Sequence, residues 1–167
     1  MKSWEEMKTF KEFLDESSLT RLASKSKKGA VAIVSASRGG KSKKENKARS
    51  KQLEKDIKGA GLPGPTKVKG RYTEHGKEPK SERSYVVTPG KKGKRKFKKA
   101  VEKLSTKYDQ DSVLIQRKGG GSATLKGTNK APWPGKGKNV KTGKMKPGRT
   151  GEFDTQIKKK TFTYERN

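Results

Sequence analysis

The sequence has 167 residues, with 45 Lys and Arg against 17 Asp and Glu, which gives a formal net charge of +28 at pH 7. Leu, Ile, Val and Phe supply only 25 residues, so the composition excludes a large buried core and predicts partial disorder in the isolated chain. Cys is absent and His75 is the single histidine, which excludes disulfides, zinc fingers, iron–sulfur clusters and two-histidine metal sites. No apolar run is long enough for a membrane span or a signal peptide, so we expect a protein made in a cytosol with no membrane partner.

The N-terminal segment differs from the rest of the chain in charge and periodicity. Residues 1–16 carry a net charge of −2, and their apolar side chains recur at steps of three and four: Trp4, Met7, Phe10, Phe13 and Leu14. This pattern predicts a short amphipathic helix. Residues 17–29 contain no acidic residue and no periodicity, as is typical of a linker.

The middle of the chain, residues 30–117, holds most of the expected secondary structure. In chain order we expect a strand at 30–37, a helix capped by Ser42 and Glu45 that runs through Leu53 and Ile57, strands at 66–72 and 83–88, a helix with Phe97, Val101, Leu104 and Tyr108 on one face, and a strand at 111–116. This order is that of the split βαβ, or ferredoxin-like, succession β-α-β-β-α-β. The sequence therefore predicts a small α+β domain with two helices on one face of a four-stranded sheet.

The C-terminal part, residues 118–167, is expected to form a basic, Gly/Lys-rich extension that is largely irregular. Short pieces at 122–127, 152–157 and 160–165 are the candidates for additional edge strands.

A polar cluster is expected where the first strand meets the first helix, and it consists of Ser35, Arg38, Glu45, Asn46 and Arg49. In α/β sheets this position often binds ligands, and the two arginines with the helix N-terminus could bind a phosphate. The alternative is structural. Glu45 would cap its helix, while the amide and the arginines would hold the loop.

Two acids precede the last expected strand, Asp109 and Asp111. With Glu45 or Glu74 they could ligate Mg²⁺, as in metal-dependent nucleases, but such a pair is more typical of a turn. We therefore expect no catalytic residue, no metal, no cofactor and no enzymatic activity.

Basic residues are the most abundant signal, and Lys predominates over Arg. Because Lys lacks the planar fork that reads base edges, we expect binding to the phosphate backbone of DNA without sequence preference. The expected contacts are Lys91, Lys92, Lys94, Arg95, Lys96, Lys98, Lys99, Lys126, Lys130, Lys136, Lys138, Lys141, Lys144, Lys146 and Arg149. Readers of single-stranded RNA with this fold also need exposed aromatics, for which Tyr72 and Tyr85 are the only candidates.

The segment MKTFKEFLDE at 7–16 resembles the capsid-targeting leader of internal head proteins in T-even-type bacteriophages. The matching residues are Met7, Lys8, Thr9, Phe10, Glu12, Phe13, Leu14 and Glu16. The resemblance implies cleavage by the head protease between Glu16 and Ser17. One departure is that six residues, MKSWEE, precede Met7.

Residues 30–117 resemble an uncharacterised domain family of bacteria and phages. The resemblance lies in segments 35–57, 70–74, 81–87 and 107–115. It implies phage origin and domain limits, and it implies no reaction.

Together these features predict a phage virion protein that lies inside the head, is made in the host cytoplasm and binds packaged DNA through its phosphates. Its further partners would be the capsid, the scaffold core or neighbouring virion proteins. One alternative is a head, neck or tail structural protein whose basic extension braces its neighbours. Another is an injected effector that acts on a host nucleic-acid enzyme.

Overall fold

The computed structural model describes residues 28–72, 80–117, 122–132, 134–142, 146–147, 153–157 and 160–163. The helix expected at 1–16 and the cleavage position between Glu16 and Ser17 lie outside these ranges. So does the linker expected at 17–29, apart from its last two residues.

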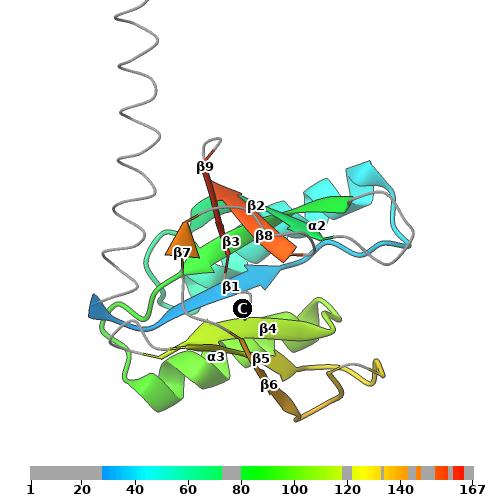
Figure 1. The fold of residues 1–167 in the computed structure, drawn as a ribbon. Coiled ribbons are helices and arrows are strands. Elements are labelled where there is room, and N and C mark those ends of the chain that lie inside the picture. The colour runs from blue at the N-terminus through cyan, green and yellow to red at the C-terminus, as the bar shows by residue number, and fades with distance from the viewer. Residues whose placement is uncertain are drawn as a thin grey trace, which may run out of the picture.

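The described chain contains two long helices and a series of strands, labelled as in Figure 1. In chain order they are β1 (Val31–Ser35), α2 (Lys43–Gly59), β2 (Thr66–Tyr72), β3 (Lys80–Val87), α3 (Lys94–Lys107), β4 (Ser112–Gln116), β5 (Ala123–Gly127), β6 (Asn139–Lys141), β7 (Lys146–Pro147), β8 (Phe153–Ile157) and β9 (Lys160–Thr163).

The strands of the described residues form one sheet in the order β6-β5-β4-β1-β3-β2-β8-β9-β7. Its centre, β4-β1-β3-β2, is the antiparallel order of the split βαβ fold, with β1 paired to both β3 and β4. The α+β fold class that the sequence predicts is confirmed. The sheet continues past β4 through β5 and past β2 through β8.

The two helices begin in different ways. Ser42 caps α2, and its side chain accepts a hydrogen bond from the backbone N–H of Glu45, as the sequence predicts. Gly93 precedes α3 and supplies no side-chain cap, and the first turn of α3 contains no acidic residue. The N-terminal N–H groups of α3 therefore lack the side-chain acceptor that α2 has.

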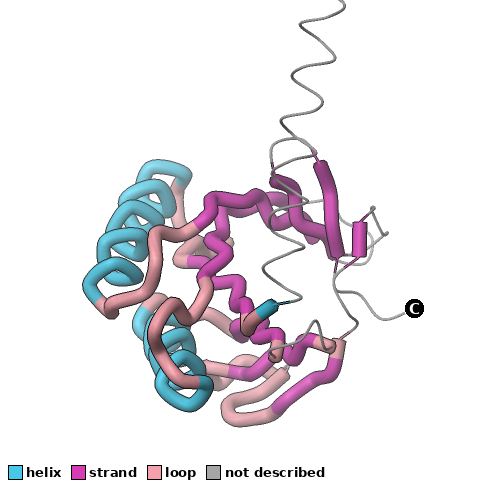
Figure 2. Tube along the Cα trace, turned by 90° about the vertical axis from the view of Figure 1, so that its left-hand side faces the viewer, coloured by secondary structure: helices cyan, strands magenta, loops and turns pink. Residues whose placement is uncertain are grey.

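Both helices cover the same face of the sheet (Figure 2). The larger buried cluster lies between the helices and this face, and it includes Leu53 and Ile57 of α2 and Phe97 and Val101 of α3. Side chains alternate along a strand, so each strand also sends residues to the opposite face. There a second, smaller buried cluster gathers Val31, Val68, Val86, Leu114 and Ala123.

The C-terminal strands extend both edges of the sheet. The strands β5, β8 and β9 fall within the three segments in which edge strands are expected, and β5 pairs with β4 along its full length. The domain limit between residues 117 and 118 stays a prediction, as does the irregular character of the remainder.

A close backbone approach fixes the loop that follows β5. The N–H of Gly127 donates to the carbonyl of Lys138 at 2.9 Å, and the N–H of Gly137 donates to the carbonyl of Gly127 at 3.0 Å. A Cβ at position 127 would lie 1.8 Å from the carbonyl oxygen of Gly135, so only glycine fits there.

Replacement of this glycine should therefore destabilise the protein. We expect Gly127→Ala to lower the free energy of unfolding by about 1–3 kcal/mol, because the added methyl displaces backbone. In the control Gly59→Ala the new methyl meets no atom within 4 Å at the end of α2, and it should raise stability by about 0.5–1 kcal/mol. Urea denaturation measures both changes, and a Gly127→Ala protein as stable as the parent would contradict this account.

Candidate functional site

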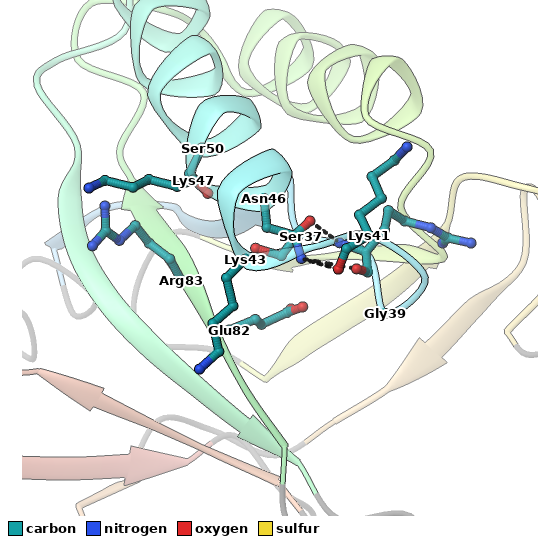
Figure 3. Close-up of a pocket in the computed structure, with 10 residues that line it drawn as sticks. Ser37, Gly39, Lys41, Lys43, Asn46, Lys47, Ser50, Glu82 and Arg83 are labelled. Atoms are coloured by element: carbon teal, nitrogen blue, oxygen red, sulfur yellow. Dashed lines mark hydrogen bonds between the residues drawn. The ribbon is translucent and has the colours of Figure 1, made fainter.

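A polar pocket of about 430 Å³ lies at the C-terminal end of β1. Three segments line it: the loop after β1, the first two turns of α2, and the part of β3 that contains Glu82 and Arg83 (Figure 3). Its volume falls within the range of small-molecule sites. Five of the lining side chains are cationic and one is a carboxylate: Arg38, Lys41, Lys43, Lys47 and Arg83 against Glu82.

The position of Glu82 follows from the strand register. Ser35, the last residue of β1, is paired with Ser84, so Glu82 lies two residues beyond the end of β1. Because side chains alternate, Glu82 is on the same face as Ser84 and Val86, away from the helices. Figure 3 shows its side chain below the first turn of α2.

Burial dominates the acid–base behaviour of Glu82 and raises its pKa to about 7. The charge of Asp111 raises this pKa further, while the Ser35 hydroxyl and the positive charge of Arg38 oppose the rise. Ser35 Oγ also lies 3.0 Å from the carbonyl oxygen of Arg83, to which it donates. Since Ser35 has one hydroxyl proton, these two acceptors compete for it. Glu82 therefore changes its protonation state near neutral pH.

The loop after β1 is held to α2 by a reciprocal pair of hydrogen bonds. The N–H of Arg38 donates to Asn46 Oδ1 at 2.9 Å, and Asn46 Nδ2 donates to the carbonyl of Arg38 at 3.0 Å. A single amide side chain thus satisfies both backbone groups of one loop residue. This contact fixes the pocket wall that faces Glu82.

Two arginines connect the same loop to the turn between α3 and β4. Arg49 donates to the carbonyls of Ala36 at 2.7 Å and of Tyr108 at 2.5 Å. Arg38 Nη1 donates to the carbonyl of Asp109 at 2.7 Å and lies 3.1 Å from Asp111 Oδ1.

The structure thus brings together most of the polar cluster that the sequence singles out. Arg38 and Asn46 line the pocket, and Ser35 donates to the carbonyl of Arg83, which also lines it. Arg49 does not line the pocket, and it donates to the carbonyl of Ala36 at the start of the loop. Glu45 does not line the pocket; it is exposed, and its carboxylate lies 3.9 Å from the lining residue Lys41. Asn46 and the arginines make the loop contacts that the structural alternative expects.

The carboxylates considered as magnesium ligands have other partners. Asp111 accepts from Asn129 Nδ2 at 2.8 Å and pairs with Arg38, and Asp109 lies 3.9 Å from the same guanidinium. Glu74 and His75 are outside the described residues. Among the residues that are described, no group of three or more His, Cys, Asp and Glu side chains could hold a metal ion.

The predicted nucleic-acid contacts are divided among several surfaces. Lys92, Lys94, Lys98, Lys126 and Lys141 line a second cavity at the other end of β1. The remaining described members are exposed on or before α3 or in the segment from 128 to 138: Lys91, Arg95, Lys96, Lys99, Lys130, Lys136 and Lys138. The side chains of Lys144, Lys146 and Arg149 lie outside the described set.

One of the two aromatics considered for base stacking is inaccessible. Tyr85 is fully buried in the helix-side cluster, and its hydroxyl donates to the carbonyl of Ser50 at 3.2 Å. The side chain of Tyr72 is not among those described. In the described part of the chain, no helix is both long and apolar enough to span a membrane.

Sequence reasoning finds the region of the pocket but misses Glu82. The available signal is the alternation in SERSYVV, which places this acid on one face with Ser84 and Val86. It also misses Ser37, Ser50 and three lysines that line the pocket, which are Lys41, Lys43 and Lys47. Their proximity to Glu82 depends on the packing of α2 against β3.

A family model described as the S-Adenosylmethionine lyase family matches residues 32–167. No curated protein matches the chain.

The family match overturns the predicted function. The expectations of a protein without enzymatic activity, of an internal head protein that binds packaged DNA, and of its structural and effector alternatives are wrong, because the matched family is an enzyme family. The error has a physical cause. A net charge of +28 reports the average attraction of the whole surface for anions, whereas catalysis depends on a few side chains in one pocket.

Glu82 should make the stability of the protein depend on pH. Its pKa is raised from 4.5 to about 7 on folding, so ionisation of this group opposes folding, and its effect on stability grows as pH rises between these values. Relative to the parent, the variant Glu82→Gln should therefore gain about 1–3 kcal/mol of stability between pH 4.5 and pH 8. Urea denaturation at several pH values measures this difference. Glu45→Gln removes an exposed carboxylate and is the matched control, and an equal gain in both variants would contradict the assignment to Glu82.

Proposed function

Because the chain belongs to the S-adenosylmethionine lyase family, we propose that it cleaves S-adenosylmethionine without water and that the polar pocket around Glu82 is the site. The observation that carries this assignment is one half-buried carboxylate surrounded by cationic side chains. The substrate carries an ammonium, a sulfonium and a carboxylate, so it offers charges of both signs to such a pocket.

The chemistry favours breaking the bond between sulfur and Cγ of the amino-acid chain. The substrate's own carboxylate oxygen attacks Cγ, and the electron pair of the C–S bond moves onto the sulfonium. The products are uncharged 5′-methylthioadenosine and homoserine lactone, which keeps the ammonium charge, and no proton is transferred. Intramolecular attack of this kind has effective molarities on the order of 10⁵–10⁸ M. Removal of a Cβ proton is the less economical route, because that carbon is flanked only by saturated carbons.

In this reaction Glu82 would pair with the substrate's α-ammonium. The positive charge on sulfur disappears as the C–S bond breaks, so an anion held against the sulfonium would favour the ground state. The ammonium keeps its charge throughout, and an ion pair with Glu82 therefore holds the substrate without opposing cleavage. The five cationic side chains of the pocket also favour cleavage. They repel the positively charged sulfonium, and this repulsion ends when the sulfur loses its charge.

The activity test uses the purified full chain and S-adenosylmethionine. We expect equal amounts of 5′-methylthioadenosine and homoserine lactone, separated by chromatography and identified by NMR. Glu82→Gln should lower kcat/KM about 100-fold, as for loss of one partner of a buried charge pair, while Glu45→Gln should stay within about twofold of the parent. Homoserine as the first product would refute non-hydrolytic cleavage, and full activity of Glu82→Gln would move the site elsewhere.

The pH profile tests the role of Glu82 separately. Only the ionised carboxylate binds an ammonium, so kcat/KM should rise tenfold per pH unit below about 7 and level off above it. The bound ammonium favours the ionised form, so the inflection in kcat should lie below that in kcat/KM. A profile for kcat/KM that is flat between pH 5.5 and pH 8 would contradict this role.

A further inference from the structure

A second cavity, of about 630 Å³, lies at the opposite end of β1 from the Glu82 pocket. Gly29 and Ala30 border it just before β1, and the loop between β3 and α3, the start of α3, and strands β4, β5 and β6 supply the rest of its lining. The two cavities share no lining residue. The larger cavity is therefore structurally separate from the site proposed for the lyase reaction.

The lining charges of this cavity are all positive. It has six cationic side chains and no Asp or Glu: Lys92, Lys94, Lys98, Arg117, Lys126 and Lys141. Lys126 Nζ lies 3.0 Å from Glu102 Oε1, and within the described chain the other five form no ion pair. Such a set of charges attracts an anion and repels S-adenosylmethionine, whose net charge is positive.

The backbone adds to this field. The cavity includes Gly93 and Lys94, where α3 begins without a side-chain cap and without an acid in its first turn. The N–H groups of this turn and the positive end of the helix dipole favour an anionic group beside them.

The floor of the cavity is apolar, which distinguishes it from a simple cationic surface. The partly buried Ala30 and Ile115 form this floor, and Phe97, which borders the cavity but is 1% exposed, packs in the helix-side cluster. Thr124 and Asn139 add neutral hydrogen-bonding groups. A flat heterocycle fits an apolar floor with a few polar groups, and phosphates fit the cationic rim.

We propose that this cavity is a second binding site, which takes a nucleoside polyphosphate. The base lies on Ala30 and Ile115, and the phosphates lie between the first turn of α3 and the lysines that line the cavity. Neither the lyase reaction nor the Glu82 pocket requires this ligand.

The test is calorimetric titration of the full chain with ATP, with inorganic tripolyphosphate and with adenosine. ATP should bind more tightly than either fragment, because only ATP engages both floor and rim. The double variant Lys94→Gln/Lys98→Gln should weaken ATP binding by roughly tenfold or more, since each lysine makes a charge-assisted contact. The control Lys103→Gln/Lys55→Gln removes two exposed lysines from α3 and α2 outside the cavity, and it should bind ATP like the parent.

Several outcomes would overturn the proposal. If tripolyphosphate binds as tightly as ATP, the apolar floor contributes nothing to binding. If the control variant Lys103→Gln/Lys55→Gln weakens ATP binding as much as Lys94→Gln/Lys98→Gln does, the effect comes from net charge and not from the cavity. Tighter binding of a single-stranded oligonucleotide than of ATP, with the same sensitivity to Lys94 and Lys98, would assign the cavity to a polymer. Glu82→Gln should leave ATP binding unchanged, and loss of binding in that variant would show that the two cavities are not independent.

Discussion

The candidate site depends on one short loop, residues 36–41, being held in place by two arginines. Arg49 reaches from α2 to the carbonyls of Ala36 and Tyr108, and Arg38 reaches from the loop to the turn after α3. These contacts join the end of β1 to the start of β4, which lie beside each other in the sheet. Gln110 Nε2, in the same turn, adds a hydrogen bond to the carbonyl of Ser37 at 3.0 Å, so the segment that faces Glu82 is joined to the α3 side of the fold by three side chains.

The arginine contacts also explain why the pocket keeps a titratable carboxylate. Asp109 and Asp111 lie near Arg38 and share its charge, so Arg38 is only partly available to neutralise Glu82. The pKa of Glu82 consequently follows its burial rather than its nearest cation. A group that ionises near neutral pH can hold a cationic substrate and can also exist without charge when the pocket is empty.

Much of the fold could be predicted from the sequence because local signals agree with each other. Ser42 with Glu45 marks the start of α2, and the spacing of Phe97, Val101 and Leu104 marks the buried face of α3. The strand order then follows from the succession of elements. Glu82 could not be placed in this way, because its environment depends on where β1 ends relative to β3, and that register is a property of the folded sheet.

The function was mispredicted for a related reason. Basic residues are spread along the whole chain, so their number dominates any sequence-based inference, while the single carboxylate of the pocket contributes one charge among 62 ionised side chains of Lys, Arg, Asp and Glu. Screening by salt limits the influence of distant charges to about 10 Å at 0.1 M. Within that range the immediate neighbours decide what binds, and net charge is a poor guide to the ligand.

The two ends of β1 illustrate this local control. One cavity contains Glu82 and suits a ligand with a positive group, while the other contains no carboxylate and suits an anion. Both lie on the same strongly basic molecule, so the long-range field is repulsive for the cationic substrate at either end. The difference between them rests on whether one acidic side chain is present, and this makes Glu82 the residue on which the substrate assignment depends.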